Sequence, residues 1–182
     1  MAATANWRLT RKATSGFFSR TLLRRGSGRM VADRAEVRAA TKSDMPEIAR
    51  LFKLSRESQL PYLPQLHTPE EDVAYFSVMV YGEQSVYLIE ENERLLGFIA
   101  YDKSWVHHLY IHPNELGKGF GAKLLKLAMQ NASILQLWAF KKNTRAINFY
   151  KKHGFVLVKE TDGSENEEKE PDVLMEWRGA WK

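Results

Sequence analysis

The sequence HLYIHPNELGKGFGAKLL, residues 108–125, joins an apolar strand pattern to a glycine-rich loop and an amphipathic helix pattern. The loop places Gly117, Gly119 and Gly121 directly before and within the start of that helix. Glycines let a backbone approach a ligand closely, and the free N–H groups at a helix N-terminus favour an anion such as a phosphate. The stretch therefore predicts a strand–loop–helix unit that binds a phosphorylated ligand, with Lys118 adding positive charge.

Two common nucleotide-binding motifs do not fit this stretch. Residues 117–122 match the dinucleotide fingerprint G-x-G-x-x-G/A, but that fingerprint needs an acidic residue at the end of the following strand. The following strand pattern, residues 135–140, contains no acidic residue. The P-loop string G-x-x-x-x-G-K-[ST] does not occur either, so both nucleotide folds are excluded.

Working outward, the rest of the chain alternates strand and helix patterns. Strands are expected over residues 37–40, 85–91, 95–102, 105–112, 134–140, 155–160 and 173–177, and helices over residues 43–58, 70–80, 119–130 and 143–152. Ser43 or Asp44 is expected to cap the first helix, and Gly154 to end the last one. The predicted order is β-α-α-β-β-β-α-β-α-β-β.

Charge divides the 182 residues into two parts. Residues 1–34 carry eight Lys or Arg and one acid, whereas residues 35–182 carry 19 bases and 21 acids. We therefore expect a basic, disordered extension over residues 1–34 and a single domain over residues 35–182. Three interpretations of the extension stay open: a disordered tail, an organelle transit peptide, and an arm for nucleic acid or anionic lipid.

The composition excludes several classes of protein. The chain has no cysteine, which excludes a disulfide scaffold, a thiolate nucleophile and a Cys-ligated zinc site. No apolar run approaches the roughly 18 residues of a membrane helix. The five histidines and nearby acids have no convincing metal spacing, so no metal site is expected. The mildly acidic body gives no sign of nucleic-acid binding. We expect a cytoplasmic protein, with organelle import through the basic extension as the alternative.

Two motifs together resemble the GNAT superfamily of acetyl-CoA-dependent N-acetyltransferases. The first is the strand Leu109–Pro113 followed by the loop Leu116–Gly121, which matches the family's Q/R-x-x-G-x-G/A except at its first residue. The second is N-x-x-A-x-x-F-Y-x-x-x-G-F, present in full from Asn143 to Phe155. The resemblance covers about residues 35–178 and implies a mixed, mostly antiparallel sheet of about seven strands. Helices would lie on both of its faces, and its central strands would splay apart.

The resemblance also implies how acetyl-CoA would be held. The backbone of the strand would bind the pantetheine arm, the loop and helix start would bind the pyrophosphate, and Asn143 would contact the coenzyme arm besides capping its helix. The residues concerned are Leu109, Tyr110, Ile111, Leu116, Gly117, Lys118, Gly119, Phe120, Gly121, Ala122 and Asn143. Leu116 replaces the family's Gln or Arg, which removes one side-chain contact but leaves the backbone donor.

Two catalytic residues are expected by the same resemblance. Tyr150 occupies the family's general-acid position beside the coenzyme sulfur; the alternative is that it only packs against a helix face. Trp105 stands where some members have a glutamate base, and His107 matches a histidine of aralkylamine-type members. An imidazole suits a base at neutral pH, although a chain of water molecules can replace it.

The acceptor is expected to be a primary amine of a small molecule or amino-acid derivative. In the family, residues matching 59–67 and 161–172 line the acceptor side. The second of these segments is strongly acidic and is either an attraction for a cationic amine or a solvated charge run. Acetylation of a protein Lys or N-terminal amine, and a non-catalytic acyl-CoA-binding module, are the alternatives. Homodimer formation is left open, and no nucleic-acid or membrane partner is expected.

Overall fold

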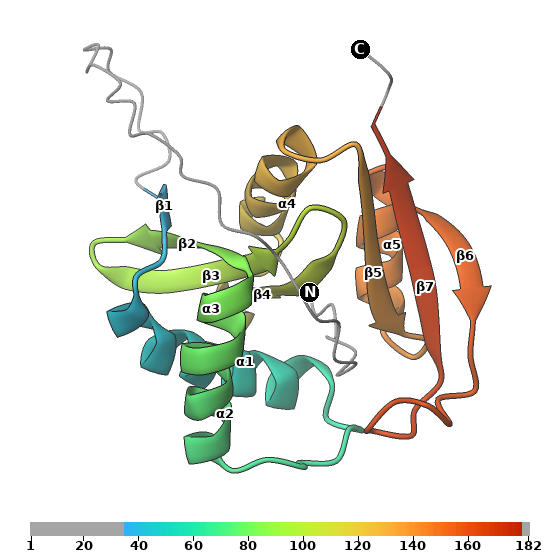
Figure 1. Cartoon of the computed structure of the whole chain (residues 1–182), viewed down its shortest axis with the longest axis horizontal. Helices are drawn as coiled ribbons and strands as arrows, with labels where there is room; N and C mark the ends of the chain where they lie inside the picture. The colour runs from blue at the N-terminus through green and yellow to red at the C-terminus, as the bar shows by residue number, and fades with distance from the viewer. Residues whose placement is uncertain (1–34, 180–182) are drawn as a thin grey trace.

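Two antiparallel sheets form the centre of the computed structural model of the protein, which describes residues 35–179 (Figure 1). The first sheet has the order β1-β2-β3-β4 and the second the order β5-β7-β6. The strands are β1 Glu36–Ala39, β2 Ser85–Glu91, β3 Arg94–Tyr101, β4 Val106–Ile111, β5 Ile134–Phe140, β6 Val156–Glu160 and β7 Asp172–Arg178. The predicted basic extension, residues 1–34, lies outside the described residues.

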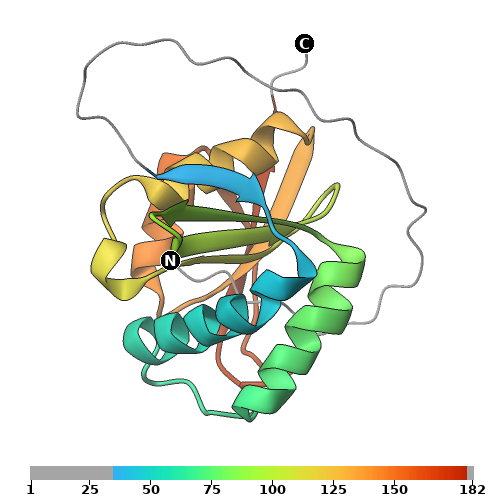
Figure 2. The same ribbon diagram turned by 90° about the vertical axis from the view of Figure 1, so that its left-hand side faces the viewer.

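Helices cover both faces of the first sheet, with α1 to α3 on one face and α4 on the other (Figure 2). The helices are α1 Met45–Gln59, α2 Pro69–Tyr75, α3 Tyr81–Glu83, α4 Phe120–Gln130 and α5 Thr144–Lys152. A π-helical stretch, Phe76–Val80, joins α2 to α3. The predicted element order and the mixed, mostly antiparallel fold are therefore confirmed. None of the helices over residues 35–179 has the length and apolar character needed to cross a membrane.

The two sheets meet where β4 and β5 run side by side. Among the described residues these parallel strands share a single bridge, between Trp105 and Gln136, and no paired ladder beyond it. The strands therefore diverge after their first residues, as expected for splayed central strands. We use the name β4–β5 cleft for the line along which these two strands have no ladder of hydrogen bonds beyond that bridge.

Side chains of β4 alternate between two cores. Leu109 and Ile111 pack with Leu124 of α4 in the core that also reaches α5. Tyr110 belongs to the other core, and the His108 ring lies among aromatic rings of that side. This period-2 alternation explains why β4 is apolar almost throughout, because both of its faces are covered.

One predicted detail of the helices is refined and one changes. Asp44 is the N-cap residue of α1, as predicted, but its side chain accepts from the Thr41 N–H at 2.6 Å, and Thr41 begins a helical turn of its own. A short 3-10 turn, residues 42–44, thereby precedes α1. The second helical segment continues past the predicted end at residue 80, since the π-helical stretch carries the chain into α3.

His108 is buried as a neutral ring between α1 and α2. It is 2% exposed, its Nε2 lies 3.4 Å from the Tyr75 hydroxyl, and the rings of Phe52 and Phe76 pack against it. Its Nδ1 has no hydrogen-bond partner among the described residues. Burial lowers the pKa of His108 to about 3, with smaller contributions from the charges of His107 and Arg56. The ring is thus part of the core and is not available as a base near neutral pH.

Acid should destabilise the fold through this residue. An unfolded histidine binds a proton near pH ~6.5 whereas buried His108 does not, so its contribution is present above pH ~6.5 and is lost as the pH falls toward 3. Urea unfolding should be measured at pH values from 7 to 4.5. As the pH falls, the free energy of unfolding should decrease more steeply for wild type than for the His108→Phe variant, by up to about 1.4 kcal/mol per pH unit. Parallel curves for the two proteins would contradict a neutral, buried His108.

Candidate active site

The glycine loop ends β4 and opens α4 with its backbone exposed. Gly117 and Gly119 have φ values of 82° and 89°, in the left-handed region that favours glycine. A Cβ added at either residue would meet no atom within 4 Å. The first intrahelical bond of α4 runs from the Lys123 N–H to the Gly119 carbonyl, so the preceding N–H groups remain for a ligand. The loop therefore presents backbone donors to open space, as an anion site requires.

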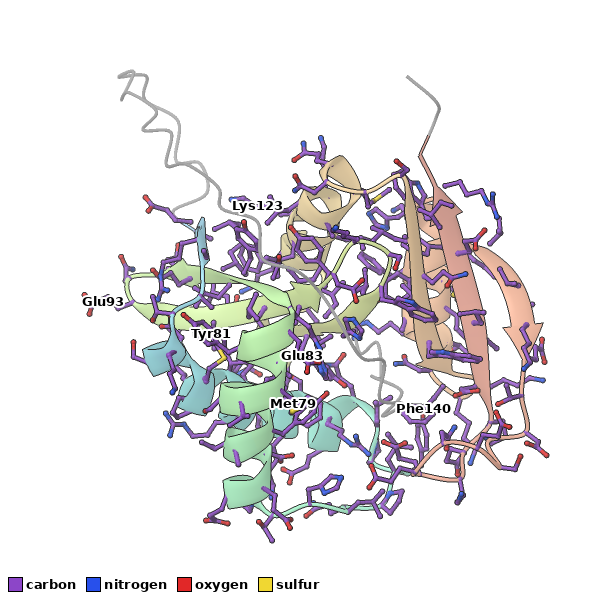
Figure 3. All side chains as sticks on the ribbon, viewed as in Figure 1. Met79, Tyr81, Glu83, Glu93, Lys123 and Phe140 are labelled. Atoms are coloured by element: carbon purple, nitrogen blue, oxygen red, sulfur yellow. The ribbon has the colours of Figure 1, made fainter. Side chains whose placement is uncertain are left out.

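A buried carboxylate organises the charges beside this loop. Glu115 is 6% exposed and accepts from Lys118 Nζ and Arg94 Nη2, both at 2.7 Å. The hydrogen bond from Lys118 and that from Arg94 outweigh burial and hold the pKa of Glu115 below its usual range. Lys118 is therefore held against Glu115. Lys123, at the first turn of α4, donates to the Ala35 carbonyl at 2.8 Å (Figure 3).

The backbone N–H and carbonyl groups of successive β4 residues point alternately toward β3 and toward the β4–β5 cleft. The His112 N–H donates to the Leu96 carbonyl of β3, so residues of the same parity, including Tyr110, direct their backbone toward β3. Leu109 and Ile111 then direct their backbone away from β3, toward the cleft. The Ile111 carbonyl already accepts from Ser55 Oγ at 3.1 Å. Of the three strand residues expected at the pantetheine arm, Leu109 has both backbone groups directed into the cleft, and Ile111 its N–H.

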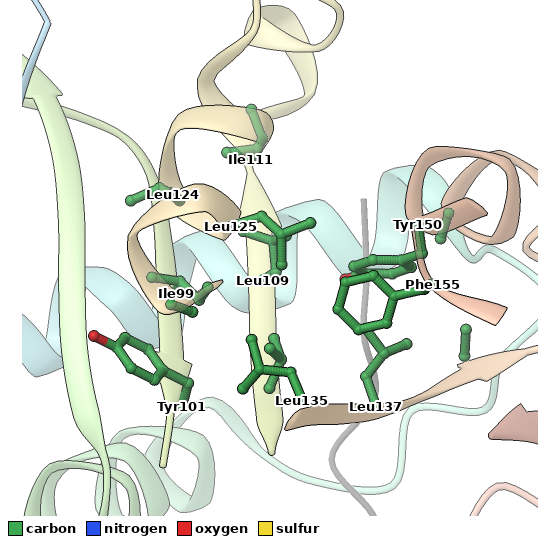
Figure 4. Packing of buried hydrophobic residues seen from close by; sticks show 14 of the residues in the cluster. Ile99, Tyr101, Leu109, Ile111, Leu124, Leu125, Leu135, Leu137, Tyr150 and Phe155 are labelled. Atoms are coloured by element: carbon green, nitrogen blue, oxygen red, sulfur yellow. The ribbon is translucent and has the colours of Figure 1, made fainter. Parts of the chain in front are cut away.

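Tyr150 is carried by α5 and lies in the core that α4, α5, β4 and β5 share. Its ring is fully buried and packs against Phe149 and Phe155, with Leu137 and the Leu109 strand nearby (Figure 4). Its hydroxyl is buried and has no hydrogen-bond partner among the described residues. Burial, and to a lesser degree the neighbouring Tyr110, raises the pKa of Tyr150 above its usual value, so the phenol stays protonated. A buried donor without an acceptor is a costly arrangement unless a ligand completes it.

Asn143 holds the N-terminus of α5. Its side-chain Oδ1 accepts from the Ala146 N–H at 3.1 Å, which is the predicted capping bond. This cap fixes the first turn of the helix that carries Tyr150, two turns further on. Leu116 and Phe120 pack partly buried against the α4 core, so any contribution of these two residues to a ligand comes from their backbone.

His107 lies at a bulge where β4 begins. Its Nε2 is 2.8 Å from Asp102 Oδ2, and a quarter of its side chain is exposed. Burial opposes the charge on Asp102, but the hydrogen bonds from His107 and from the Ser104 backbone outweigh it and lower the pKa of the carboxyl. The ring is thus held by a charged partner close to the point where β4 and β5 separate.

A pocket of about 170 Å³ lies on the α1 side, along the segment that follows this helix. Apolar and charged side chains alternate in its wall: Phe52, Lys53, Arg56, Glu57, Leu60, Pro61, Leu63, Pro64, Gln65, Leu66, His67 and Asp72. The segment expected on the acceptor side thus forms a concave wall. Tyr62 lies outside that lining, with the Lys142 ammonium 5.2 Å from the centroid of its ring.

The acidic loop between β6 and β7 is tied to this wall. Two of its carboxylates form ion pairs with other segments, Glu168 with Arg56 and Glu170 with Lys142, and Glu167 Oε2 lies 3.2 Å from His67 Nε2. The Glu168–Arg56 pair is the best shielded, at 2.8 Å with side-chain exposures of 10% and 19%. The loop is therefore docked on the pocket wall through its charges and is not simply a solvated charge run.

Sequence reasoning missed two charged residues of the site, Asp102 and Glu115. Asp102 looked like the last residue of a strand, and its partner five residues later is reached only because a turn and a bulge intervene. Glu115 lies just before the glycine loop, but its partner Arg94 belongs to another strand, β3. Neither contact has a spacing signature that a single sequence could reveal.

Comparisons with known proteins agree with this geometry. A profile of the acetyltransferase (GNAT) domain matches residues 82–157. An uncharacterised N-acetyltransferase of Archaeoglobus fulgidus is 28% identical over 133 residues, covering 63% of this chain and 88% of the relative. The peptidyl-lysine N-acetyltransferase YiaC of Escherichia coli is 25% identical over 142 residues, covering 78% and 95%.

A solved structure has the same fold. YncA from Salmonella typhimurium, a putative acetyltransferase determined with its cofactor acetyl-CoA, superposes with a TM-score of 0.63 over 80% of this chain and 94% of its own, at 17% identity. The fold, both sequence motifs and the matched domain profile point the same way. The profile match and these relatives support membership of the GNAT superfamily of N-acetyltransferases.

Proposed function

We propose that the protein transfers an acetyl group from acetyl-CoA to the primary amine of a small molecule or amino-acid derivative, by direct attack in a ternary complex. The observation that carries the proposal is the buried Tyr150 hydroxyl, which has no partner among the described residues and lies in the core that β4 and β5 share. A thioester sulfur placed at the β4–β5 cleft would give the hydroxyl its missing acceptor.

The coenzyme would lie along β4 and end at the glycine loop. The N–H and carbonyl of Leu109 and the N–H of Ile111 would pair with the amide groups of the pantetheine arm, as a strand edge pairs with an extended peptide. The N–H groups of Gly119 to Ala122, at the positive end of α4, would hold the pyrophosphate. Asn143 would orient the start of α5, and Lys118 would add charge beside the phosphates.

The reaction forms an N–C bond and breaks the C–S bond. A base removes a proton from the acceptor ammonium, and the free amine attacks the thioester carbonyl. Tyr150 donates its proton to the leaving thiolate, and His107 is the candidate base. The raised pKa of Tyr150 keeps its proton in place until the sulfur acquires charge. The attacking nitrogen loses its second proton as the tetrahedral intermediate collapses, and that proton restores the Tyr150 phenol. Amine and acetyl-CoA are thus converted into amide and CoA, with the first ammonium proton released to solvent from the base.

The acceptor side supports a small amine. The docked loop and the pocket of about 170 Å³ form a wall that matches one side chain or a compact molecule better than a folded surface. One specific observation favours a second candidate, a protein lysine, because YiaC is named a peptidyl-lysine N-acetyltransferase. A panel of amines, amino acids and lysine peptides, with detection of the CoA thiol, separates the two. No turnover with any acceptor, despite coenzyme binding, would favour a non-catalytic acyl-CoA-binding module.

The glycine loop can be tested by a matched pair of variants. Acetyl-CoA at a hundred times its Kd should stabilise wild type by about 2.7 kcal/mol, seen as a rise in Tm, whereas NAD should have no effect. Gly119→Ala forces an alanine into the left-handed region at a cost of about 1–2 kcal/mol, so it should weaken coenzyme binding about tenfold. Gly82→Ala, in helical and equally open surroundings, is the control and should bind like wild type. Equal binding by both variants would remove the loop from the site.

Tyr150→Phe tests the proton donor. The variant should lower kcat by about 100-fold while leaving acetyl-CoA affinity nearly unchanged, because only the hydroxyl is lost. Tyr101→Phe removes a hydroxyl from another largely buried tyrosine of the same core and should leave kcat close to wild type. An unchanged kcat in Tyr150→Phe would show that the residue only packs.

A further inference from the structure

Asp102 and His107 form a pair between the end of β3 and the start of β4. Asp102 Oδ2 lies 2.8 Å from His107 Nε2. At this distance the pair is hydrogen-bonded, and an ionised carboxylate can only accept. The bond therefore places the imidazole proton on Nε2 and leaves a lone pair on Nδ1.

The carboxylate is fixed from the other side by the turn. Asp102 Oδ1 accepts from the N–H groups of Ser104 at 2.9 Å and Trp105 at 2.8 Å, and the Asp102 N–H donates to the Trp105 carbonyl at 2.9 Å. One oxygen thus holds the turn while the other is directed at the ring. The orientation of the carboxylate is set by backbone atoms, and not by a freely rotating side chain.

The bulge explains why His107 can reach this carboxylate. Ala100 pairs with His108 and Tyr101 with Val106, so His107 is the extra residue of β4. A bulge releases a residue from the strict alternation of the pleat and re-aims its side chain. The same short stretch contains the Trp105–Gln136 bridge, after which β4 and β5 separate. His107 therefore lies at the narrow end of the β4–β5 cleft, where the arm of a thioester would end.

We propose that Asp102 is a positioning residue for acetyl transfer, which holds His107 in the Nε2–H tautomer so that Nδ1 accepts the proton of the acceptor ammonium. This inference rests on the proposed function. In the step, an ammonium N–H bond breaks, an Nδ1–H bond forms, and the amine keeps the electron pair with which it attacks the thioester. The imidazolium is stabilised by the Asp102 carboxylate and returns its proton to solvent.

No other charged side chain among the described residues takes the place of Asp102 as the partner of His107. The adjacent His108 is turned into the α1-side core and is neutral there, so it adds no charge when His107 is protonated. Asp102 is the carboxylate that contacts His107 among the described residues. A neutral neighbour and one carboxylate partner are what is expected around a histidine base that a second residue holds in one tautomer.

The tautomer can be read directly in the full chain without any substrate. Proton–nitrogen correlation spectra of protein with 15N-labelled histidine, assigned with a His107→Gln variant, should show His107 as Nε2–H. Asp102→Asn keeps an oxygen for the Ser104 and Trp105 N–H groups but directs an NH₂ at the ring, so it should shift His107 to Nδ1–H. A wild-type Nδ1–H tautomer, or no change in the variant, would overturn the proposal.

Kinetics test the same pair with a matched control. Asp102→Asn should lower kcat about 10- to 100-fold with little change in KM for acetyl-CoA. The double variant Asp102→Asn/His107→Gln should be no slower than His107→Gln alone, because the two residues act as one unit. Glu47→Gln, which neutralises an exposed carboxylate in the first turn of α1 away from the site, should behave like wild type. Full activity of Asp102→Asn, or multiplying effects in the double variant, would contradict the role.

Failure of the two proposals can be distinguished. If no amine is acetylated although the tautomer shifts as expected, acetyl transfer as the function fails while the Asp102–His107 pairing stands. If amines are acetylated but Asp102→Asn is fully active, the function stands and the positioning role is wrong. Melting temperatures of all variants show whether a loss of activity reflects unfolding.

Discussion

The single bridge between Trp105 and Gln136 is the constraint on which the site depends. Parallel strands that kept pairing would close the sheet and bury their own N–H and carbonyl groups. Because β4 and β5 separate instead, the backbone groups of Leu109 and the Ile111 N–H are not paired in a strand ladder, and the Tyr150 hydroxyl has no partner among the described residues. The energetic cost of leaving such groups unpaired is the physical reason to expect a polar, extended ligand there.

The elements around the opening hold it in place. Buried leucines of α4 pack beneath β4, and the Asn143 cap fixes the first turn of α5, the helix that carries Tyr150. On the opposite face, α1 and the docked acidic loop form a wall held by the shielded Arg56–Glu168 pair. The coenzyme and the acceptor would thus arrive from different faces of the sheet, as direct transfer in a ternary complex requires.

Much of this arrangement could be predicted from the sequence, because hydrophobic periodicity and glycine positions are local properties. The strand before the loop, the α4 helix and the Asn143 cap follow from residues close together in the chain. The Asp102–His107 contact and the Glu115 cluster could not be predicted, since the first depends on a bulge and the second on a neighbouring strand. The docking of the acidic loop could not be predicted either, since two of its partners, Arg56 and His67, lie about a hundred residues away in the sequence.

The central claim is that acetyl-CoA occupies the opening between β4 and β5 and ends at Tyr150. The most direct measurement is an NMR titration of the 15N-labelled full chain with acetyl-CoA, which follows every backbone amide at once. The account predicts perturbed amides at Leu109, Ile111 and Gly117 to Ala122, together with the start of α5. Perturbations confined to the α1-side pocket, or none at saturating acetyl-CoA, would contradict it.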